Sequence, residues 1–280
     1  MRWTRGDRSN IEDRRGSAVR GAMPLGIGGL LLLLALSWFT GVDFLSLLDG
    51  GGVPQSHVEP TGTSGPIETS PEEERSVDMV DAVMADAHST WSDLLGGQYQ
   101  PTTAVLFREA TSSTCGFAQS AVGPFYCPAD RKVYLDLSFF HELRSRFGAP
   151  GEFAQAYVLA HEVGHHVQTL MGLESRVRQL QQSNPVDRNE LSVRMELQAD
   201  CFAGVWGKSA ATPGGRVDLD PGDMEDGLRA AAAIGDDTLQ RRSGGRVMPD
   251  KFTHGSSEQR VTWFRRGFES GDPNACNTFN

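Results

Sequence analysis

The stretch His161-Glu162-Val163-Gly164-His165 decides how this chain folds and what it can bind. On an α-helix, residues four apart lie one turn apart on the same face, so the two imidazoles can reach one ion. Glu162 points about 100° around the helix from His161, toward whatever that ion holds. Two neutral nitrogen ligands, an open coordination position and a nearby carboxylate base are typical of zinc sites that activate water. The alternative is that these residues form only the polar edge of an ordinary core helix.

The segment that carries this motif has the pattern of a buried helix. Residues 154–170 contain no proline, and their apolar residues recur with a period of about 3.6, at Ala156, Ala160, Val163, Val167 and Leu170. Gly164 is a poor helix former, costing about 1 kcal/mol relative to alanine, but its missing side chain lets an ion or a second helix approach closely. We therefore predict a helix over 154–170 that packs against the core and presents both histidines on one stripe.

A third metal ligand is needed, and a second predicted helix offers one. Gln168 and Met171 occupy the positions where one large branch of zinc peptidases has glycine and histidine, which excludes that branch. Residues 189–207 have a helical pattern and carry Glu196 and Asp200, four apart on one face. We predict that Glu196 binds the metal and that Asp200 accepts a hydrogen bond from the free ring nitrogen of a histidine ligand. Two other glutamates are rival ligands, Glu174 and Glu190.

Further motifs resemble the neutral zinc metallopeptidase family of bacterial membrane-anchored proteins. The resemblance covers nearly the whole chain, with matching runs at residues 1–3, 12–16, 123–128, 133–136, 139–140, 161–166, 196–201, 252–256 and 263–267. It implies a zinc-dependent peptidase fold. It implies less about the substrate, because the family's name rests largely on the metal motif already described.

The start of the chain is basic and is followed by an uncharged apolar stretch. Residues 1–22 hold six arginines and three acidic residues, and residues 23–42 hold no charge. About 20 such residues can span a ~30 Å hydrocarbon layer, and the arginines before them place the N-terminus inside. We predict a cytoplasmic basic segment at 1–22, a single-pass transmembrane helix at 23–42, a flexible stalk at 43–71 and an extracytoplasmic domain at 72–280. A cleaved signal peptide is the competing interpretation.

Four cysteines lie in the predicted outer domain: Cys115, Cys127, Cys201 and Cys276. An even number of cysteines outside a membrane favours disulfides, and three pairings are possible. We favour Cys115 with Cys127, which closes a short loop, and Cys201 with Cys276, which ties the end of the chain to the second site helix. Free buried thiols are the alternative, whereas a cysteine zinc cluster is disfavoured because no Cys-x-x-Cys pair occurs.

The predicted fold class is α+β, zincin-like and mostly helical, with a small sheet packed on the motif helix. Besides the two site helices, helical patterns cover 72–95, 138–147, 177–182, 221–234 and 256–268, and strand patterns cover 102–107 and 132–137. Within the second strand, 133–137 is the candidate edge for pairing with a substrate backbone. The net charge of −10 argues against a nucleic-acid partner, because phosphate contacts need lysine and arginine.

These residues predict a zinc metalloendopeptidase with one Zn²⁺ per chain, held by His161, His165 and Glu196. Glu162 is the expected general base, taking a proton from water and passing it to the leaving amine. The expected partners are a peptide or protein substrate in the cell envelope and the membrane around the anchor. Two other functions use the same residues: a zinc-stabilised scaffold domain without turnover, and a zinc hydrolase of a non-peptide amide.

The negative charge that develops on the substrate carbonyl needs a hydrogen-bond donor. His254 is the candidate because it lies in a loop just before a predicted helix start and is followed by Gly255. An ordinary surface histidine is the alternative interpretation. Tyr157, one helical turn before His161, is a second candidate donor.

Overall fold

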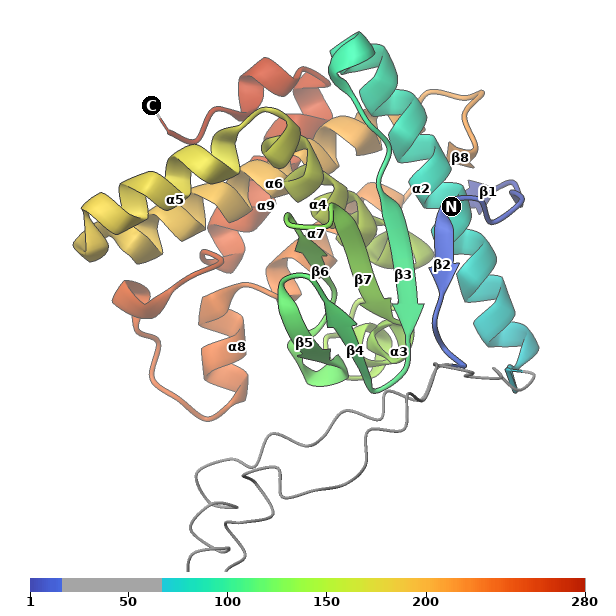
Figure 1. Cartoon of the computed structure of the whole chain (residues 1–280), viewed down its shortest axis with the longest axis horizontal. Helices are drawn as coiled ribbons and strands as arrows, with labels where there is room; N and C mark the ends of the chain where they lie inside the picture. Colours follow the sequence, from blue (N-terminus) through green and yellow to red (C-terminus); the bar gives the residue numbers. More distant parts are fainter. Residues whose placement is uncertain (17–66, 280) are drawn as a thin grey trace, which may run out of the picture. The chain divides into compact units, whose positions relative to one another are not determined.

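Helices make up most of the structure and pack mainly on one face of a small sheet (Figure 1). The computed structural model describes residues 1–16 and 67–279. The described α-helices are α2 (Pro71–Leu95), α3 (Ser138–Ser145), α4 (Glu152–Leu170), α5 (Leu173–Ser183), α6 (Arg188–Ala210), α7 (Asp223–Ala233), α8 (Asp236–Arg242) and α9 (Ser257–Ser270). The described strands are β1 (Arg2–Trp3), β2 (Ile11–Asp13), β3 (Thr103–Phe107), β4 (Ala110–Ser113), β5 (Gly116–Gln119), β6 (Phe125–Cys127), β7 (Lys132–Asp136) and β8 (Val217–Asp218). The fold is therefore mixed α+β and mostly helical, as predicted.

The main sheet has four strands in the order β2-β3-β7-β6. Strand β3 pairs in parallel with β2 and with β7, and Val105 of β3 lies opposite Tyr134 of β7. Strand β6 pairs antiparallel with β7 and has no second strand partner in the described part of the chain. The prediction that 133–137 is an edge strand is therefore wrong. The residues are a strand, but both of its sides are occupied, and the edge nearest the motif helix is β6.

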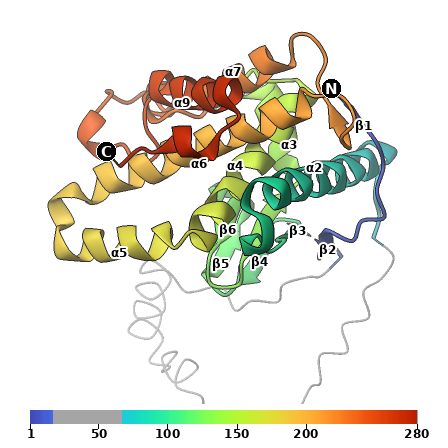
Figure 2. The same ribbon diagram turned by 90° about the horizontal axis from the view of Figure 1, so that it is seen from above.

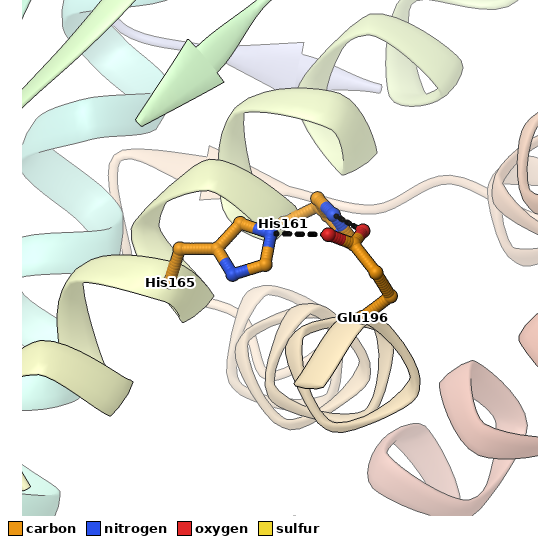
Figure 3. Close-up of side chains that lie close together, drawn as sticks. All are labelled: His161, His165 and Glu196. Carbon is orange, nitrogen blue, oxygen red and sulfur yellow. Dashed lines mark hydrogen bonds and ion pairs between the residues drawn. The ribbon is translucent and has the colours of Figure 1, made fainter. Parts of the chain in front are cut away.

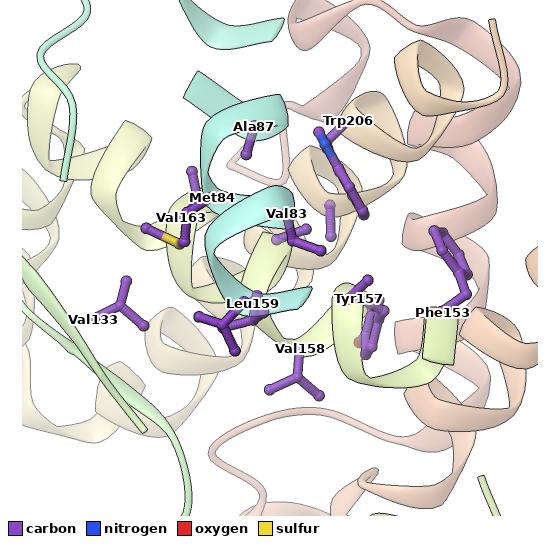
Figure 4. Packing of buried hydrophobic residues seen from close by; sticks show 14 of the residues in the cluster. Val83, Met84, Ala87, Val133, Phe153, Tyr157, Val158, Leu159, Val163 and Trp206 are labelled. Carbon is purple, nitrogen blue, oxygen red and sulfur yellow. The ribbon is translucent and has the colours of Figure 1, made fainter. Parts of the chain in front are cut away.

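The core forms where α4 meets the other layers (Figure 4). Phe153 of α4 stacks on Trp206 of α6, with ring centroids 5.8 Å apart. Val163 of α4 packs into the same cluster as Met84 of α2 and Val133 of β7. Because the cluster takes side chains from helices and sheet alike, it fixes α4 in the middle of the domain.

Small residues let the helices around α4 approach closely. A Cβ atom added at Gly164 would lie only 2.9 Å from the carbonyl oxygen of Ala199 on α6, so only glycine fits at this crossing. The same holds where α6 meets α9, since a Cβ on Gly267 would lie 1.9 Å from the carbonyl oxygen of Cys201. Helices α6 and α9 lie side by side in both views (Figures 1 and 2). Of the two roles expected for Gly164, close approach of an ion or of a second helix, the structure shows the second.

The first sixteen residues belong to the folded unit that contains residues 67–279. Strand β1 pairs with β8, and β2 extends the main sheet beside β3. The guanidinium of Arg15 is buried and forms ion pairs with Asp13, Glu73 and Glu74. Two hydrogen-bonded strands cannot lie on opposite sides of a membrane. The predictions of a cytoplasmic segment at 1–22 and an extracytoplasmic domain at 72–280 therefore cannot both hold for residues 1–16.

Most of the predicted anchor and stalk lies outside the described residues. The anchor at 23–42 and residues 43–66 of the stalk belong to that part. Over residues 1–16 and 67–279, none of the helices has the length and apolar character that a membrane crossing requires.

The two disulfides join the cysteines that were predicted from the sequence to pair. Cys115 bonds to Cys127, and Cys201 bonds to Cys276. The first disulfide joins the β4–β5 turn to strand β6. The second ties the C-terminal 3₁₀ turn (Pro273–Cys276) to the middle of α6, one residue after Asp200.

Candidate metal centre

Two helices bring three metal-binding side chains together. His161 and His165 come from α4 and Glu196 comes from α6, and one ligand atom of each lies within 4.8 Å of the others (Figure 3). The Nε2 atom of His161 is 3.1 Å from Glu196 Oε2, and Nε2 of His165 is 3.5 Å from Glu196 Oε1. The predicted third residue therefore reaches both histidines from the neighbouring helix.

Asp200 holds the far side of the first histidine. Its Oδ1 lies 2.8 Å from Nδ1 of His161, so that Nδ1–H donates and Nε2 faces Glu196. Arg260 of α9 donates to both oxygens of Asp200, at 2.8 and 2.9 Å. Tyr157 also donates its hydroxyl hydrogen to Asp200. Because Asp200 is fully buried and accepts from three side chains, the ring of His161 has one available orientation.

Gln168 holds the far side of the second histidine. Its Oε1 lies 2.8 Å from Nδ1 of His165, and its amide nitrogen donates to the carbonyl of Met195 and to Gln198. In the sequence, Gln168 served only to exclude the branch of zinc peptidases that has glycine at this position. Its role as the hydrogen-bond partner of His165 was missed. The i, i+3 spacing from His165 is the signal that could have found it.

Tyr157 does not reach the site as a donor. Its side chain is fully buried and its hydroxyl is used by Asp200. The prediction of Tyr157 as a second oxyanion donor is therefore wrong. Arg260, which the sequence analysis missed, lies 3.4 Å from both the Tyr157 hydroxyl and His161 Nδ1.

The other histidines and glutamates near the motif have separate roles. His166 is buried against the sheet, where it contacts the Tyr126 hydroxyl at 3.0 Å and the Gln100 carbonyl at 2.6 Å. Glu190 is exposed and pairs with Arg194 one turn along α6. Glu174 lines the cleft but is not among the clustered metal-binding atoms. Neither rival glutamate takes the place of Glu196.

The cluster lies in a cleft of about 640 Å³ that also contains Glu162 and His254. Glu162 is only 7% exposed, and burial raises the pKa of its carboxyl, with Glu196 adding to the effect. A carboxyl whose pKa is raised is a stronger base than an ordinary surface glutamate.

His254 is held by a carboxylate at the start of α8. Asp236 Oδ2 accepts hydrogen bonds from the backbone N–H groups of Thr253, His254 and Gly255, at 2.7, 2.7 and 3.1 Å. Its Oδ1 lies 3.2 Å from Nδ1 of His254. This hydrogen bond, together with the negative charges of Asp236 and Glu196, raises the pKa of His254. Asp236 was missed in the sequence, where an Asp-Asp pair after a glycine looks like ordinary charge at a helix start.

The next aspartate fastens the other side of this loop. Asp237 accepts hydrogen bonds from the backbone N–H and the hydroxyl of Ser257, each at 2.8 Å. Ser256 caps α9, with its side chain accepting from Gln259 N and the Gln259 side chain accepting from Ser256 N. The loop 252–257 is therefore fixed at both ends.

The charges of the site suit a divalent cation. Although burial disfavours the charged imidazolium, Asp200 and Glu196 raise the pKa of His161 to about 10. Burial by itself would raise the pKa of Glu196, but the two histidines hold it well below its usual value. The carboxylates thus favour positive charge between them, which protons or a metal ion can supply. Two imidazoles and one carboxylate are a donor set that zinc accepts.

Comparison with known proteins agrees with this site. A family model described as "Putative neutral zinc metallopeptidase" matches residues 1–279. The uncharacterized protein YpfJ of Escherichia coli strain K12 is 48% identical over 293 aligned positions, covering 100% of this chain and 99% of the relative. The uncharacterized protein Rv2575 of Mycobacterium tuberculosis is 41% identical over 249 positions, 83% of each chain. No solved structure matches. The chain belongs to the family of neutral zinc metallopeptidases that this model describes, and the family implies zinc.

Proposed function

We propose that this protein is a zinc-dependent peptidase that hydrolyses peptide bonds in the cleft between α4, β6 and the loop 252–257. The observation that carries the proposal is the position of Glu162. It lies in the same cleft as the three clustered ligands, with a carboxyl whose pKa is raised by burial. A purely structural zinc site usually takes a fourth protein ligand and has no use for such a base.

In this proposal His161, His165 and Glu196 hold the metal, and Asp200 and Gln168 orient the two imidazoles. When bound, zinc supplies a Lewis acid that lowers the pKa of water from ~16 toward ~7. Glu162 accepts the proton and later returns it to the leaving amine. His254, whose pKa is raised by its hydrogen bond to Asp236, donates from Nε2 to the oxygen on which negative charge develops. Its ring is about half exposed in the cleft, which leaves Nε2 accessible.

Strand β6 is the edge that a substrate backbone would use. It lines the cleft through Phe125 and Tyr126, and among the described strands it pairs with β7 alone. The disulfide from Cys127 to Cys115 fastens its end. An extended peptide could add to this free side, so main-chain hydrogen bonds would supply affinity with little dependence on sequence.

The proposed substrates are peptides or proteins of the cell envelope. The two disulfides favour an oxidising, extracytoplasmic compartment. A single membrane crossing by residues 23–42 is not part of the proposal. In either orientation it would separate residues 1–16 from the sheet that they complete.

The test uses the full chain and its Glu162→Gln variant, with zinc content and hydrolysis of a peptide library measured on both. We expect one zinc per chain in both proteins and a roughly 10²- to 10⁴-fold loss of hydrolysis in the variant. Glu190→Gln, an exposed change on α6, is the matched control and should keep both properties. Undiminished hydrolysis by Glu162→Gln would contradict the mechanism. Bound zinc without hydrolysis by the parent would favour a scaffold or a non-peptide amide.

A further inference from the structure

The C-terminal segment is tied to the side of α6 that faces away from Glu196. Cys276 forms a disulfide with Cys201, and the hydroxyl of Thr278 donates to the carbonyl oxygen of Arg194 at 2.7 Å. Residues 194 and 201 lie about 20° apart around a helix, whereas residue 196 lies roughly 140° to 160° from both. The segment, which lies beside α6 in Figure 2, therefore holds a metal-binding helix from the side opposite its ligand.

A chain of hydrogen bonds leads from this segment to the second histidine. The carbonyl oxygen of Cys276 accepts from the amide nitrogen of Gln198 at 3.0 Å. The amide oxygen of Gln198 accepts from Gln168 at 3.0 Å, and the amide oxygen of Gln168 lies 2.8 Å from Nδ1 of His165. Both glutamines and Cys276 are buried, so water does not compete for these bonds.

Each bond of this chain has one possible direction. A carbonyl oxygen only accepts, so Gln198 turns its NH₂ group to Cys276 and its amide oxygen to Gln168. Gln168 then presents its NH₂ group to Gln198 and to the carbonyl oxygen of Met195. Its amide oxygen is left to face His165, whose Nδ1 must therefore carry the hydrogen. Nε2 of that ring is then free to bind a metal.

The same disulfide also lies beside the partner of the first histidine. Cys201 directly follows Asp200, whose carboxylate accepts from Nδ1 of His161. The two ends of the disulfide therefore stand next to the partners of both imidazoles. Cys201 does so in the sequence of α6, and Cys276 does so through its hydrogen bond to Gln198.

We propose that the C-terminal turn closed by the Cys201–Cys276 disulfide is a positioning element of the metal centre, and that Gln198 is the positioning residue through which it acts on His165. This proposal rests on the proposed function for its zinc site but not for turnover. An imidazole held in one tautomer and one orientation binds zinc without the cost of ordering its ring. Zinc affinity therefore depends on a part of the chain that supplies none of the three ligands.

The experiment measures the zinc affinity of the full chain by competition with a chromogenic chelator, with circular dichroism to verify folding. We expect Gln168→Met, which removes the direct partner of His165, to lower affinity roughly ten- to a hundredfold. Gln198→Met, one step further away, should lower it roughly three- to tenfold. If Gln198 acts through Gln168, the double variant loses no more than Gln168→Met alone. Additive losses would indicate a general packing effect and would overturn the proposal.

Removal of each disulfide gives a matched comparison. Cys201→Ala combined with Cys276→Ala should lower zinc affinity at least as much as Gln198→Met does. Cys115→Ala combined with Cys127→Ala removes a disulfide that lies outside the two metal-binding helices, and should leave zinc affinity unchanged. Equal losses in the two double variants would mean that the C-terminal disulfide has no special relation to the metal centre.

A second control lies on the C-terminal segment itself. Thr278→Val removes the hydrogen bond to the Arg194 carbonyl, which belongs to the same segment but not to the chain of bonds that reaches His165. Zinc affinity should stay unchanged in this variant. A loss equal to that of Gln198→Met would attribute the effect to loosening of the segment rather than to Gln198.

The outcomes separate this role from the proposed function. Peptide hydrolysis by the parent, with unchanged zinc affinity in a folded Gln198→Met protein, would overturn the positioning role and leave the peptidase intact. The expected losses of zinc affinity, with no hydrolysis of any peptide by the parent, would support the positioning role and overturn the peptidase. If Gln198→Met fails to fold, Gln198→Asn, whose shorter side chain cannot reach both partners, should show the same fall. Unchanged affinity in a folded Gln198→Asn protein would also overturn the positioning role.

Discussion

The two halves of the candidate site are held by different kinds of interaction. The metal cluster stands on α4 and α6, which touch at Gly164 and share a buried ion network around Asp200. The loop 252–257 carries His254 and is held by hydrogen bonds to the carboxylates of Asp236 and Asp237. The half that must keep fixed coordination distances is built by close packing. The half that would donate a hydrogen bond to the developing negative charge is built from groups whose charge can respond to pH.

The largest effect should come from removing the buried cation of the packed half. Arg260→Met leaves the Asp200 carboxylate without its charge partner in a fully buried site. We expect a loss of roughly 3–5 kcal/mol in the free energy of unfolding, measured by urea denaturation. Arg266→Met, on the exposed side of the same helix, should cost less than about 1 kcal/mol. Equal losses in the two variants would argue against the ion network as the element that holds this half.

A smaller effect should follow from separating the two site helices. In Gly164→Ala the new Cβ meets the Ala199 carbonyl, so α6 must shift. Overpacking of this kind costs about 1–3 kcal/mol, of which better helix propensity recovers up to about 1 kcal/mol. Zinc affinity, measured by competition with a chromogenic chelator, should fall as well. Gly97→Ala, with no atom within 4 Å of its Cβ, is the control and should leave zinc affinity unchanged.

Substitutions that act on His254 in the loop 252–257 should change the rate of hydrolysis and its dependence on pH. The carboxylate of Asp236, the charge of Glu196 and the opposing charge of Arg260 act on His254, and the net result is a raised pKa. If protonated His254 is the donor, activity falls as pH rises through that pKa. Asp236→Asn should lower kcat roughly tenfold or more and move this fall to lower pH, with a matching change in the His254 pKa measured by NMR. Asp237→Asn, which loosens the loop without touching the ring, should keep the pH profile.

The smallest effect should come from the helix cap beside this loop. Ser256→Ala removes the side chain that accepts from Gln259 N at the start of α9. We expect a loss of about 1 kcal/mol in thermal or urea unfolding, with zinc content unchanged. Ser270→Ala, at the other end of α9, should have less effect. A loss of zinc in Ser256→Ala would mean that the two halves are coupled more tightly than their contacts indicate.

The packed half was the easier one to predict from sequence. The 3.6-residue period of α4 and the Glu196–Asp200 spacing on α6 are strong local signals, and both helices lie close to their expected bounds. The roles of Arg260 and Asp236 could not be found in this way, because each depends on a helix packing that no local pattern encodes. Strand β7 shows the same limit, since its apolar residues identify a strand but not its neighbours.

The N-terminal strands could not have been predicted from periodicity. Strand β2 is three residues long, and only Ile11 in it is apolar. Its place in the sheet depends on pairing with β3, far along the chain. The six arginines of residues 1–22 led instead to the prediction that the N-terminus lies on the inner side of a membrane. In the structure, three of them, Arg5, Arg8 and Arg15, form ion pairs with carboxylates of α2.

The pairing of β2 with β3 also bears on how the protein can be shortened. A chain that begins at residue 72 would lose β2 and leave β3 with a row of unpaired N–H and C=O groups, among them the Leu106 carbonyl that now accepts from Arg14 N at 2.7 Å. Such an open edge invites pairing with a second copy, so the shortened protein should self-associate. A separate peptide covering residues 1–16 should insert as the missing strand and reverse this self-association.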